Sequence, residues 1–180
     1  MRKIILLTFL LLNSLLFCQE LTYEEVIPVD SSVTKEELYN RARTWFAKSF
    51  KDEGEVLTIQ DKDTGEISGN GSFRYRTKKM FFGLWCIVGN IHFKINIYLK
   101  DGKYKYTIHS LTHEGSYFDG NRPISYGLLT VDENAPQPSR GGANDKVWRD
   151  IKVKSDEKIV AIISDLRQAM TKNHETSNDW

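Results

Sequence analysis

A strict alternation of apolar and polar residues from Asn90 to Lys100 constrains the fold of this chain more than any other feature. The apolar positions are Ile91, Phe93, Ile95, Ile97 and Leu99. Because successive side chains of a β-strand point to opposite faces of a sheet, this segment predicts a strand with one buried and one solvated face. Asp101-Gly102 follows, a two-residue turn that tolerates positive φ and predicts a hairpin.

The turn also fixes the expected register of the hairpin. With Lys100 opposite Lys103, the sequence predicts four cross-strand pairs: Leu99 with Tyr104, Ile97 with Tyr106, Ile95 with Ile108, and Lys94 with His109. The last pair lies on the solvated face. The central hairpin is therefore expected to build the core with one face and meet water with the other.

The remaining periodic segments predict two helices and three further strands. Glu25–Val29 reads as an edge strand because Pro28 has no N–H to donate, and residues 56–60 and 67–75 read as a hairpin. Thr34 caps a helix in which Glu37 completes a capping box, and Ser155 is the expected N-cap of a closing helix. The pattern predicts an α+β domain: a single antiparallel meander sheet with two helices on one face, in the order β-α-β-β-β-β-α.

Domain boundaries follow from composition. Residues 1–18 are expected to be a signal peptide, residues 21–172 a single domain and residues 173–180 a polar tail. Within the domain, residues 113–145 have no sustained period and predict a long loop, of which residues 124–131 are apolar enough to dock or form a short strand. The part from Asn134 to Asn144, rich in Pro and Gly, is expected to be mobile.

The leader predicts export to the periplasm or the extracellular space. Arg2 and Lys3 precede an apolar run from Ile4 to Phe17 that is short for a membrane span. Cys18 leaves an alternative open, in which the cysteine is lipidated and anchors the domain to the envelope. The bulky Phe17 before Cys18 favours simple cleavage.

Charge and cysteine content exclude some partners and bonds. The chain carries 25 basic and 24 acidic side chains, so loss of Arg2 and Lys3 with the leader leaves the acidic ones one in excess. This balance argues against nucleic acid as a partner. Cleavage at Cys18 would leave only Cys86, which precludes an intrachain disulfide and is expected to be a buried apolar residue.

One set of titratable and polar side chains is expected to converge, on the solvated face of the central hairpin and its rim: His92, Lys94, Asn96, His109 and His113. These residues are the candidate binding site. Two imidazoles can transfer a proton or ligate a metal, but without a placed third ligand they predict no metal site. The alternative interpretation is that they are ordinary residues of a wet sheet face. No motif predicts a catalytic residue or a cofactor.

The chain also resembles a known family of secreted bacterial proteins, classed as a domain of unknown function with a TATA-binding-protein-like (TBP-like) fold. The resemblance spans roughly Leu21 to Met170. It rests on Glu25–Val29, the Trp45-Phe46 helix, the Gly69-x-Gly71 strand and the segment from Ile95 to Tyr104. It implies a fold and no site residues, and a shared fold name does not imply DNA binding.

Together these observations predict a non-catalytic binding or interaction module of the cell envelope, whose partner is a protein or a small molecule. The membrane is an expected partner only if Cys18 is lipidated. Two alternatives remain open. The first is a carrier of a small apolar ligand in a cavity between sheet and helices, above Phe73, Phe93 and Tyr106. The second is a small hydrolase that uses the face carrying His92 and His109.

Overall fold

A computed structural model describes residues 19–49, 56–81, 87–116, 122–136 and 141–172 of this chain. Five long or medium strands form one antiparallel sheet: β1 (Tyr23–Pro28), β2 (Val56–Asp61), β3 (Glu66–Tyr75), β4 (Gly89–Lys100) and β5 (Lys103–Gly115). Their order across the sheet is β1-β5-β4-β3-β2, and the two-residue strand β6 (Gly127–Leu128) pairs with β5. The order places β1 at an edge, as its proline predicts.

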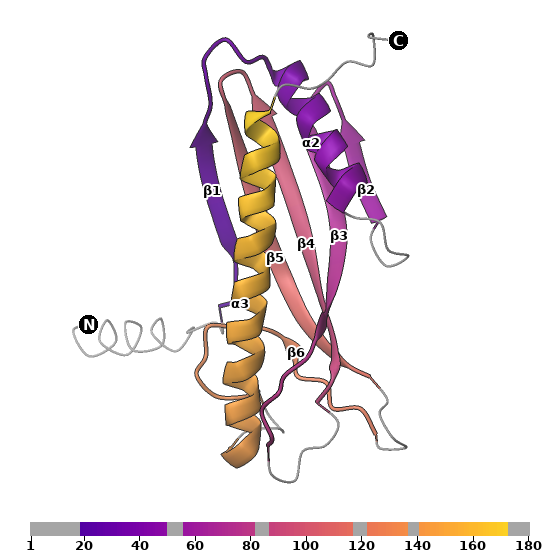
Figure 1. The fold of residues 1–180 in the computed structure, drawn as a ribbon, viewed down its shortest axis with the longest axis vertical. Helices are drawn as coiled ribbons and strands as arrows, with labels where there is room; N and C mark the ends of the chain where they lie inside the picture. Colours follow the sequence, from indigo (N-terminus) through magenta and orange to yellow (C-terminus); the bar gives the residue numbers. More distant parts are fainter. Residues whose placement is uncertain (1–18, 50–55, 82–86, 117–121, 137–140, 173–180) are drawn as a thin grey trace, which may run out of the picture.

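Two helices cover the same face of this sheet (Figure 1). Helix α2 (Lys35–Ser49) lies over β3 and β4 at one end, and α3 (Gly142–Thr171) runs along the length of the sheet. The predicted α+β class with helices on one face is confirmed. The additional strand β6 is the one departure from the predicted order of elements.

The central hairpin has the register that the sequence predicts. Leu99 lies opposite Tyr104, and Lys94 lies opposite His109. The turn residue Gly102 has a φ of 70°, a conformation that costs glycine little. The face of β4 that the alternation predicts to be buried is buried, at Ile91, Phe93, Ile95, Ile97 and Leu99.

Helix α2 begins where its cap predicts. The hydroxyl of Thr34 accepts a hydrogen bond from the N–H of Glu37 at 3.2 Å, and the Asp101 carboxylate accepts one from the N–H of Lys35 at 2.6 Å. The second bond fastens the start of α2 to the β4–β5 turn. The helix buries its apolar stripe against the sheet, at Leu38, Ala42, Trp45 and Phe46.

Helix α3 starts much earlier than expected. It begins at Gly142 and runs without a break through Ser155, so the prediction of a cap at Ser155 is wrong. The reason is that Ser155 lies four residues from both Ile151 and Ile159, on the stripe that faces the sheet. Its side chain is buried, and its hydroxyl has no hydrogen-bond partner among the described residues.

The described parts of the segment expected to be a loop, residues 113–145, contain regular structure. β5 continues to Gly115 and α3 begins at Gly142, so strand and helix occupy both ends of the expected loop. Residues 124–131 dock as predicted: they contain β6, and Thr130 forms an isolated bridge with Glu20. The indole N–H of Trp148 donates to the carbonyl of Asp132 at 2.7 Å and holds this segment against α3.

Some predictions fall on parts of the chain outside the described residues: the signal peptide at 1–18, Cys86, the tail at 173–180, and residues 137–140 of the segment expected to be mobile. Among the residues that are described, no helix is both long enough and apolar enough to span a bilayer.

Candidate functional site

The predicted polar face exists on the side of the sheet away from the helices. Asn96 and His109 lie on neighbouring strands, and the Nε2 of His109 is 3.3 Å from the Asn96 amide oxygen. The other ring nitrogen, Nδ1, is 2.9 Å from the hydroxyl of Ser110. Lys94 lies directly opposite His109 and is exposed. The structure therefore brings Lys94, Asn96 and His109 together as expected.

His92 stands apart from this group. It lies opposite Thr112, and its Nε2 is 3.3 Å from a carboxylate oxygen of Glu114, with both side chains exposed. Such exposed pairs contribute little to stability because water screens them. Within the described ranges, no group of three or more His, Cys, Asp or Glu side chains is placed to hold a metal ion.

His113 is not on the rim of this face, where the sequence analysis expected it. Between the His92–Thr112 and Lys94–His109 pairs, two residues of β5, Ser110 and Leu111, lie opposite one residue of β4, Phe93, which is a β-bulge. Ser110 in the bulge has a φ of 55°. The extra residue reverses the alternation, so Leu111 and His113 point toward the helices and are fully buried.

His113 instead joins an aromatic and polar cluster under α3. Its ring centroid is 5.7 Å from that of Tyr75 and 5.6 Å from that of Tyr126, whose backbone N–H donates to His113 Nδ1 at 3.3 Å. Burial lowers the pKa of His113 to about 4, against a weaker opposing effect of the Ile87 backbone. The imidazole is therefore neutral at physiological pH.

A buried carboxylate completes the cluster. The Tyr75 hydroxyl donates to Asp150 at 2.8 Å, and the ammonium of Lys79 lies 2.6 Å from the other carboxylate oxygen. Burial raises the pKa of Asp150, but its hydrogen bonds with Lys79, Tyr75 and Thr77 outweigh burial and hold the pKa below its usual value. Asp150, Tyr75 and Lys79 thus satisfy one another, which indicates a structural role for this part of the cluster.

On the outer face of the sheet, three side chains are arranged in the order found in some catalytic triads. Ser110, His109 and Asn96 form a hydroxyl–imidazole–amide chain, which resembles the order of groups in a nucleophilic triad. Acyl transfer also needs donors for an oxyanion and walls that exclude water. This chain lies on the solvated face, and neither of the two hollows described next includes any of its residues.

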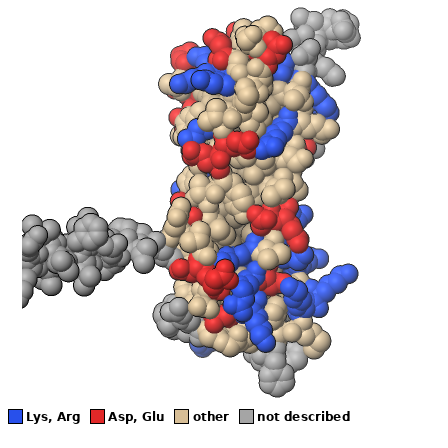
Figure 2. All heavy atoms as spheres, turned by 90° about the vertical axis from the view of Figure 1, so that its left-hand side faces the viewer, with Lys and Arg blue, Asp and Glu red and all other residues tan. Residues whose placement is uncertain are grey.

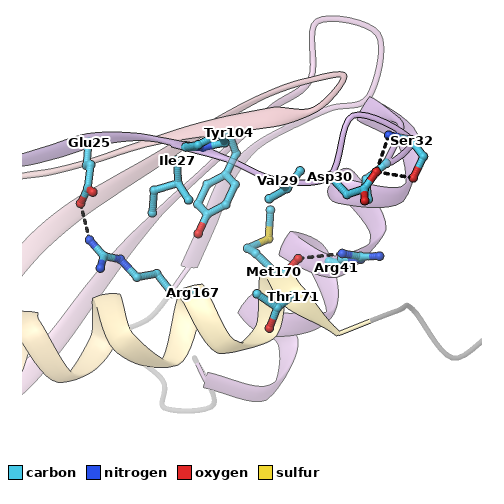
Figure 3. Close-up of a pocket in the computed structure, with 12 residues that line it drawn as sticks. Glu25, Ile27, Val29, Asp30, Ser32, Arg41, Tyr104, Arg167, Met170 and Thr171 are labelled. Atoms are coloured by element: carbon cyan, nitrogen blue, oxygen red, sulfur yellow. Dashed lines mark hydrogen bonds and ion pairs between the residues drawn. The ribbon is translucent and has the colours of Figure 1, made fainter.

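A groove of about 580 Å³ lies between β1 and the C-terminal end of α3 (Figure 3). β1 contributes Glu25 and Ile27, which face the helices because they pair with Tyr106 and Tyr104 of β5. Apolar side chains form much of the wall: Ile27, Val29, Val33 and Met170. The groove is not visible in the sequence, because Glu25 and Arg167 on its two walls are 142 residues apart.

Charged groups close one side of the groove. A guanidinium nitrogen of Arg167 on α3 pairs with the carboxylate of Glu25 on β1, and the Tyr106 hydroxyl donates to the same carboxylate at 3.0 Å. Arg41 lies at the other side, where its Nε contacts Glu37 at 2.8 Å and its Nη1 donates to the Met170 carbonyl at 2.7 Å. Arg41 thereby caps the end of α3.

Tyr104 supplies a polar group inside the groove. The residue is 2 % exposed, and its hydroxyl makes no hydrogen bond to any residue that the structure describes. Figure 3 shows the hydroxyl directed from β5 toward α3. Burial raises the pKa of Tyr104 to about 12, so the hydroxyl keeps its proton and can donate.

A second hollow, of about 440 Å³, lies between α2 and α3 over the sheet. Trp45, Phe93 and Ile162 line it, and the indole N–H of Trp45 donates to Asp165 at 2.8 Å. Phe93 is one of three residues above which a carrier cavity was expected. The other two, Phe73 and Tyr106, are not among the residues that line it.

Comparison with known proteins agrees with the architecture. An antiparallel sheet with two helices on one face places the chain among proteins with a TBP-like fold. The chain belongs to the domain of unknown function DUF4468 with TBP-like fold, whose family model matches residues 23–114. A search of curated proteins found no match.

Two solved structures are similar to this chain. A TBP-like protein from Parabacteroides distasonis is 15 % identical, with a TM-score of 0.57, over 86 % of this chain and 95 % of that one. A DUF4468 family protein from Bacteroides ovatus is 12 % identical, with a TM-score of 0.56, over 87 % and 90 %. At this identity the likeness shows the fold alone.

Proposed function

We propose that this protein is a non-catalytic binding module of the cell envelope and that it holds a small ligand in the groove between β1 and α3. The observation that carries the proposal is the hydroxyl of the buried residue Tyr104, which opens onto a partly apolar groove and has no hydrogen-bond partner among the described residues. Ligand sites of this volume combine apolar walls with a few polar groups that orient the ligand. A hydroxyl that opens onto such a groove can donate a hydrogen bond to a ligand held there.

Two observations favour binding over hydrolysis. The histidines of the candidate site are divided by the sheet, with His92 and His109 outside and His113 inside. The hydroxyl–imidazole–amide chain at Ser110 faces water rather than a hollow. A groove between sheet and helices also suits the carrier alternative, although it lies beside Tyr104 rather than above Phe73 and Phe93.

The surface charge favours a small molecule over nucleic acid. Figure 2 shows acidic and basic side chains interspersed on the β1 side of the molecule, above and below an uncharged band. Nucleic-acid binding depends on a concentrated basic surface that displaces counterions. The proposed location in the envelope is supported by the leader-like segment, in which Arg2 and Lys3 precede the apolar run.

A groove-filling variant tests the binding site. The uncharged apolar fluorophore N-phenylnaphthylamine is titrated into the protein purified after expression of the full chain. Thr171→Trp places an indole in the groove from an exposed position at the end of α3. We expect it to weaken binding of the fluorophore at least roughly tenfold.

Val153→Trp is the matched control, because Val153 is an exposed residue of the same helix outside the groove. It should leave the affinity unchanged. Equal affinities for Thr171→Trp and the unmodified protein, or no binding of the fluorophore at all, would contradict the proposed site.

A further inference from the structure

We infer that the β1–α3 groove takes a small apolar monocarboxylic acid, whose carboxylate accepts hydrogen bonds from the Tyr104 hydroxyl and the Arg167 guanidinium. The inference rests on the proposed function and names the chemical class of its ligand.

The Tyr104 hydroxyl calls for an acceptor in the ligand. It is held protonated by burial, and it points into the groove without a partner among the described residues. A phenolic O–H donates most strongly to a charged oxygen. The head group that complements this position is therefore one that presents an oxygen acceptor.

Arg167 decides the charge of that head group. Its guanidinium has five N–H donors, which exceeds what the Glu25 carboxylate and the Tyr106 hydroxyl can use. The charge of Arg167 lowers the pKa of the Tyr104 hydroxyl, whereas Tyr106 and Glu25 raise it. Arg167 therefore acts at the Tyr104 hydroxyl as well as at Glu25, and its positive charge is the one an anionic head group would meet there.

The rest of the groove sets the body of the ligand. Beyond the ion pair, apolar side chains such as Ile27, Val29 and Met170 form part of the walls, and the polar residues Asp30, Ser32 and Thr171 lie toward the other side. The side chain of Arg41 is 5 % exposed, against 49 % for Arg167, and it is held by Glu37 and by the Met170 carbonyl, so Arg41 is a much less accessible guanidinium for a second acid group. One carboxylate attached to an aliphatic or aromatic body fits this distribution.

The edge of β1 argues for a small molecule rather than an extended peptide. A peptide that added a strand to this edge would need backbone donors along it. Pro28 has none, and Glu24 and Glu25 place charges on the same short strand, features that natural proteins use to block strand addition. A small ligand needs only the side-chain groups already described.

The test compares decanoate with decanol, which share an alkyl chain and differ in the head group. Both are titrated calorimetrically at pH 7.5 into the protein purified after expression of the full chain and freed of co-purified lipid. We expect decanoate to bind about tenfold more tightly than decanol. Tyr104→Phe should weaken decanoate about tenfold, the effect of one hydrogen bond to a charged group, whereas Tyr98→Phe on the outer face should not.

A second pair of variants gives a gain that a structural defect cannot produce. Glu25→Gln removes the carboxylate that competes for Arg167, so we expect decanoate to bind about threefold more tightly while decanol is unchanged. Glu24→Gln is the matched control. The carboxylate of Glu24 is next to Glu25 in the sequence, but it lies on the outer face of the sheet and pairs with Lys105.

The outcomes separate the two proposals. If decanol binds as tightly as decanoate, or if Glu25→Gln behaves as Glu24→Gln does, the carboxylic-acid inference is wrong while binding in the groove stands. If neither alkyl probe nor N-phenylnaphthylamine binds, the proposed function is wrong as well.

Discussion

At the scale of single residues, His113 has the most unusual environment in the described part of the chain. It is fully buried between Tyr75 and Tyr126, and its pKa is lowered from 6.5 to about 4. Gly89 lies against it: a Cβ at that position would come within 2.9 Å of the His113 Nε2 and 2.2 Å of the Glu114 carbonyl oxygen. The close packing explains why the ring excludes water and a proton.

This burial predicts a pH dependence of stability. The unfolded chain binds a proton at this residue below about pH 6.5, and the folded chain does so only below about pH 4. Stability therefore falls as the pH drops through this window, by about 3 kcal/mol for a shift of this size. In urea titrations at pH 7 and pH 4, we expect His113→Gln to lose less stability on acidification than the unmodified protein does.

His92→Gln is the control for that measurement. His92 is exposed on the outer face and should leave the acid-induced loss as it is in the unmodified protein. His113→Gln leaves every carboxylate in place, so its difference from the unmodified protein isolates His113. A His113→Gln variant with an undiminished loss would mean that the folded state accepts the proton at no cost.

At the scale of elements, the bulge in β5 decides which side chains are buried. Up to His109 the register follows from the turn at Asp101-Gly102, and the prediction is confirmed. Beyond it the apolar positions change from Tyr104, Tyr106 and Ile108 to Leu111, so the spacing becomes three. That change of spacing was visible in the sequence and is the signal that could have placed His113 inside.

Removing the extra residue tests this role. Deletion of Ser110 would restore simple alternation and leave Leu111 and His113 facing the helices, so we expect the chain still to fold cooperatively. Ser110→Gly keeps the bulge and removes the cost of positive φ on a residue with a Cβ, so its stability should stay within about 1 kcal/mol of the original. Circular dichroism and thermal melts measure both variants; a deletion variant that fails to fold would contradict the assignment.

Substitution of Ser155 in helix α3 distinguishes a helix N-cap from a buried residue inside the helix. A Ser155 that capped a helix would lose about 1 kcal/mol on substitution by alanine. In the structure Ser155 is a buried interior residue with an unpaired hydroxyl. We therefore expect Ser155→Ala to raise the free energy of unfolding by about 0.5–1 kcal/mol in urea titrations. A loss of stability would favour the cap.

The groove between β1 and α3 could not be predicted from the sequence, and the reason differs from that for the bulge in β5. Hydrophobic periodicity predicts which face of an element is buried, but not which polar side chains meet across elements. Glu25 and Arg167 are 142 residues apart, and their pairing depends on how the last turns of α3 lie along β1. Whether the Tyr104 hydroxyl has a partner among the described residues depends on the same arrangement, so no local sequence pattern predicts it.

At the scale of the whole molecule, the leader predicts a processed, exported chain. We expect the protein recovered from the envelope fraction to have the intact mass of a chain cut near Cys18, without added acyl groups. Intact-mass spectrometry of that fraction measures this directly. A mass increased by a diacylglyceryl group, lost in a Cys18→Ser variant, would contradict simple cleavage and establish the lipid anchor.

The start of the folded body bears on that alternative. The carbonyl of Gln19 accepts a hydrogen bond from the Val131 N–H at 2.9 Å, and Glu20 bridges Thr130. A single peptide bond separates Cys18 from this fixed point. If acyl chains were attached at Cys18, no flexible linker would separate them from the folded domain. The domain would then lie directly against the lipid headgroups, and the position at which the sheet begins would set its orientation relative to the bilayer.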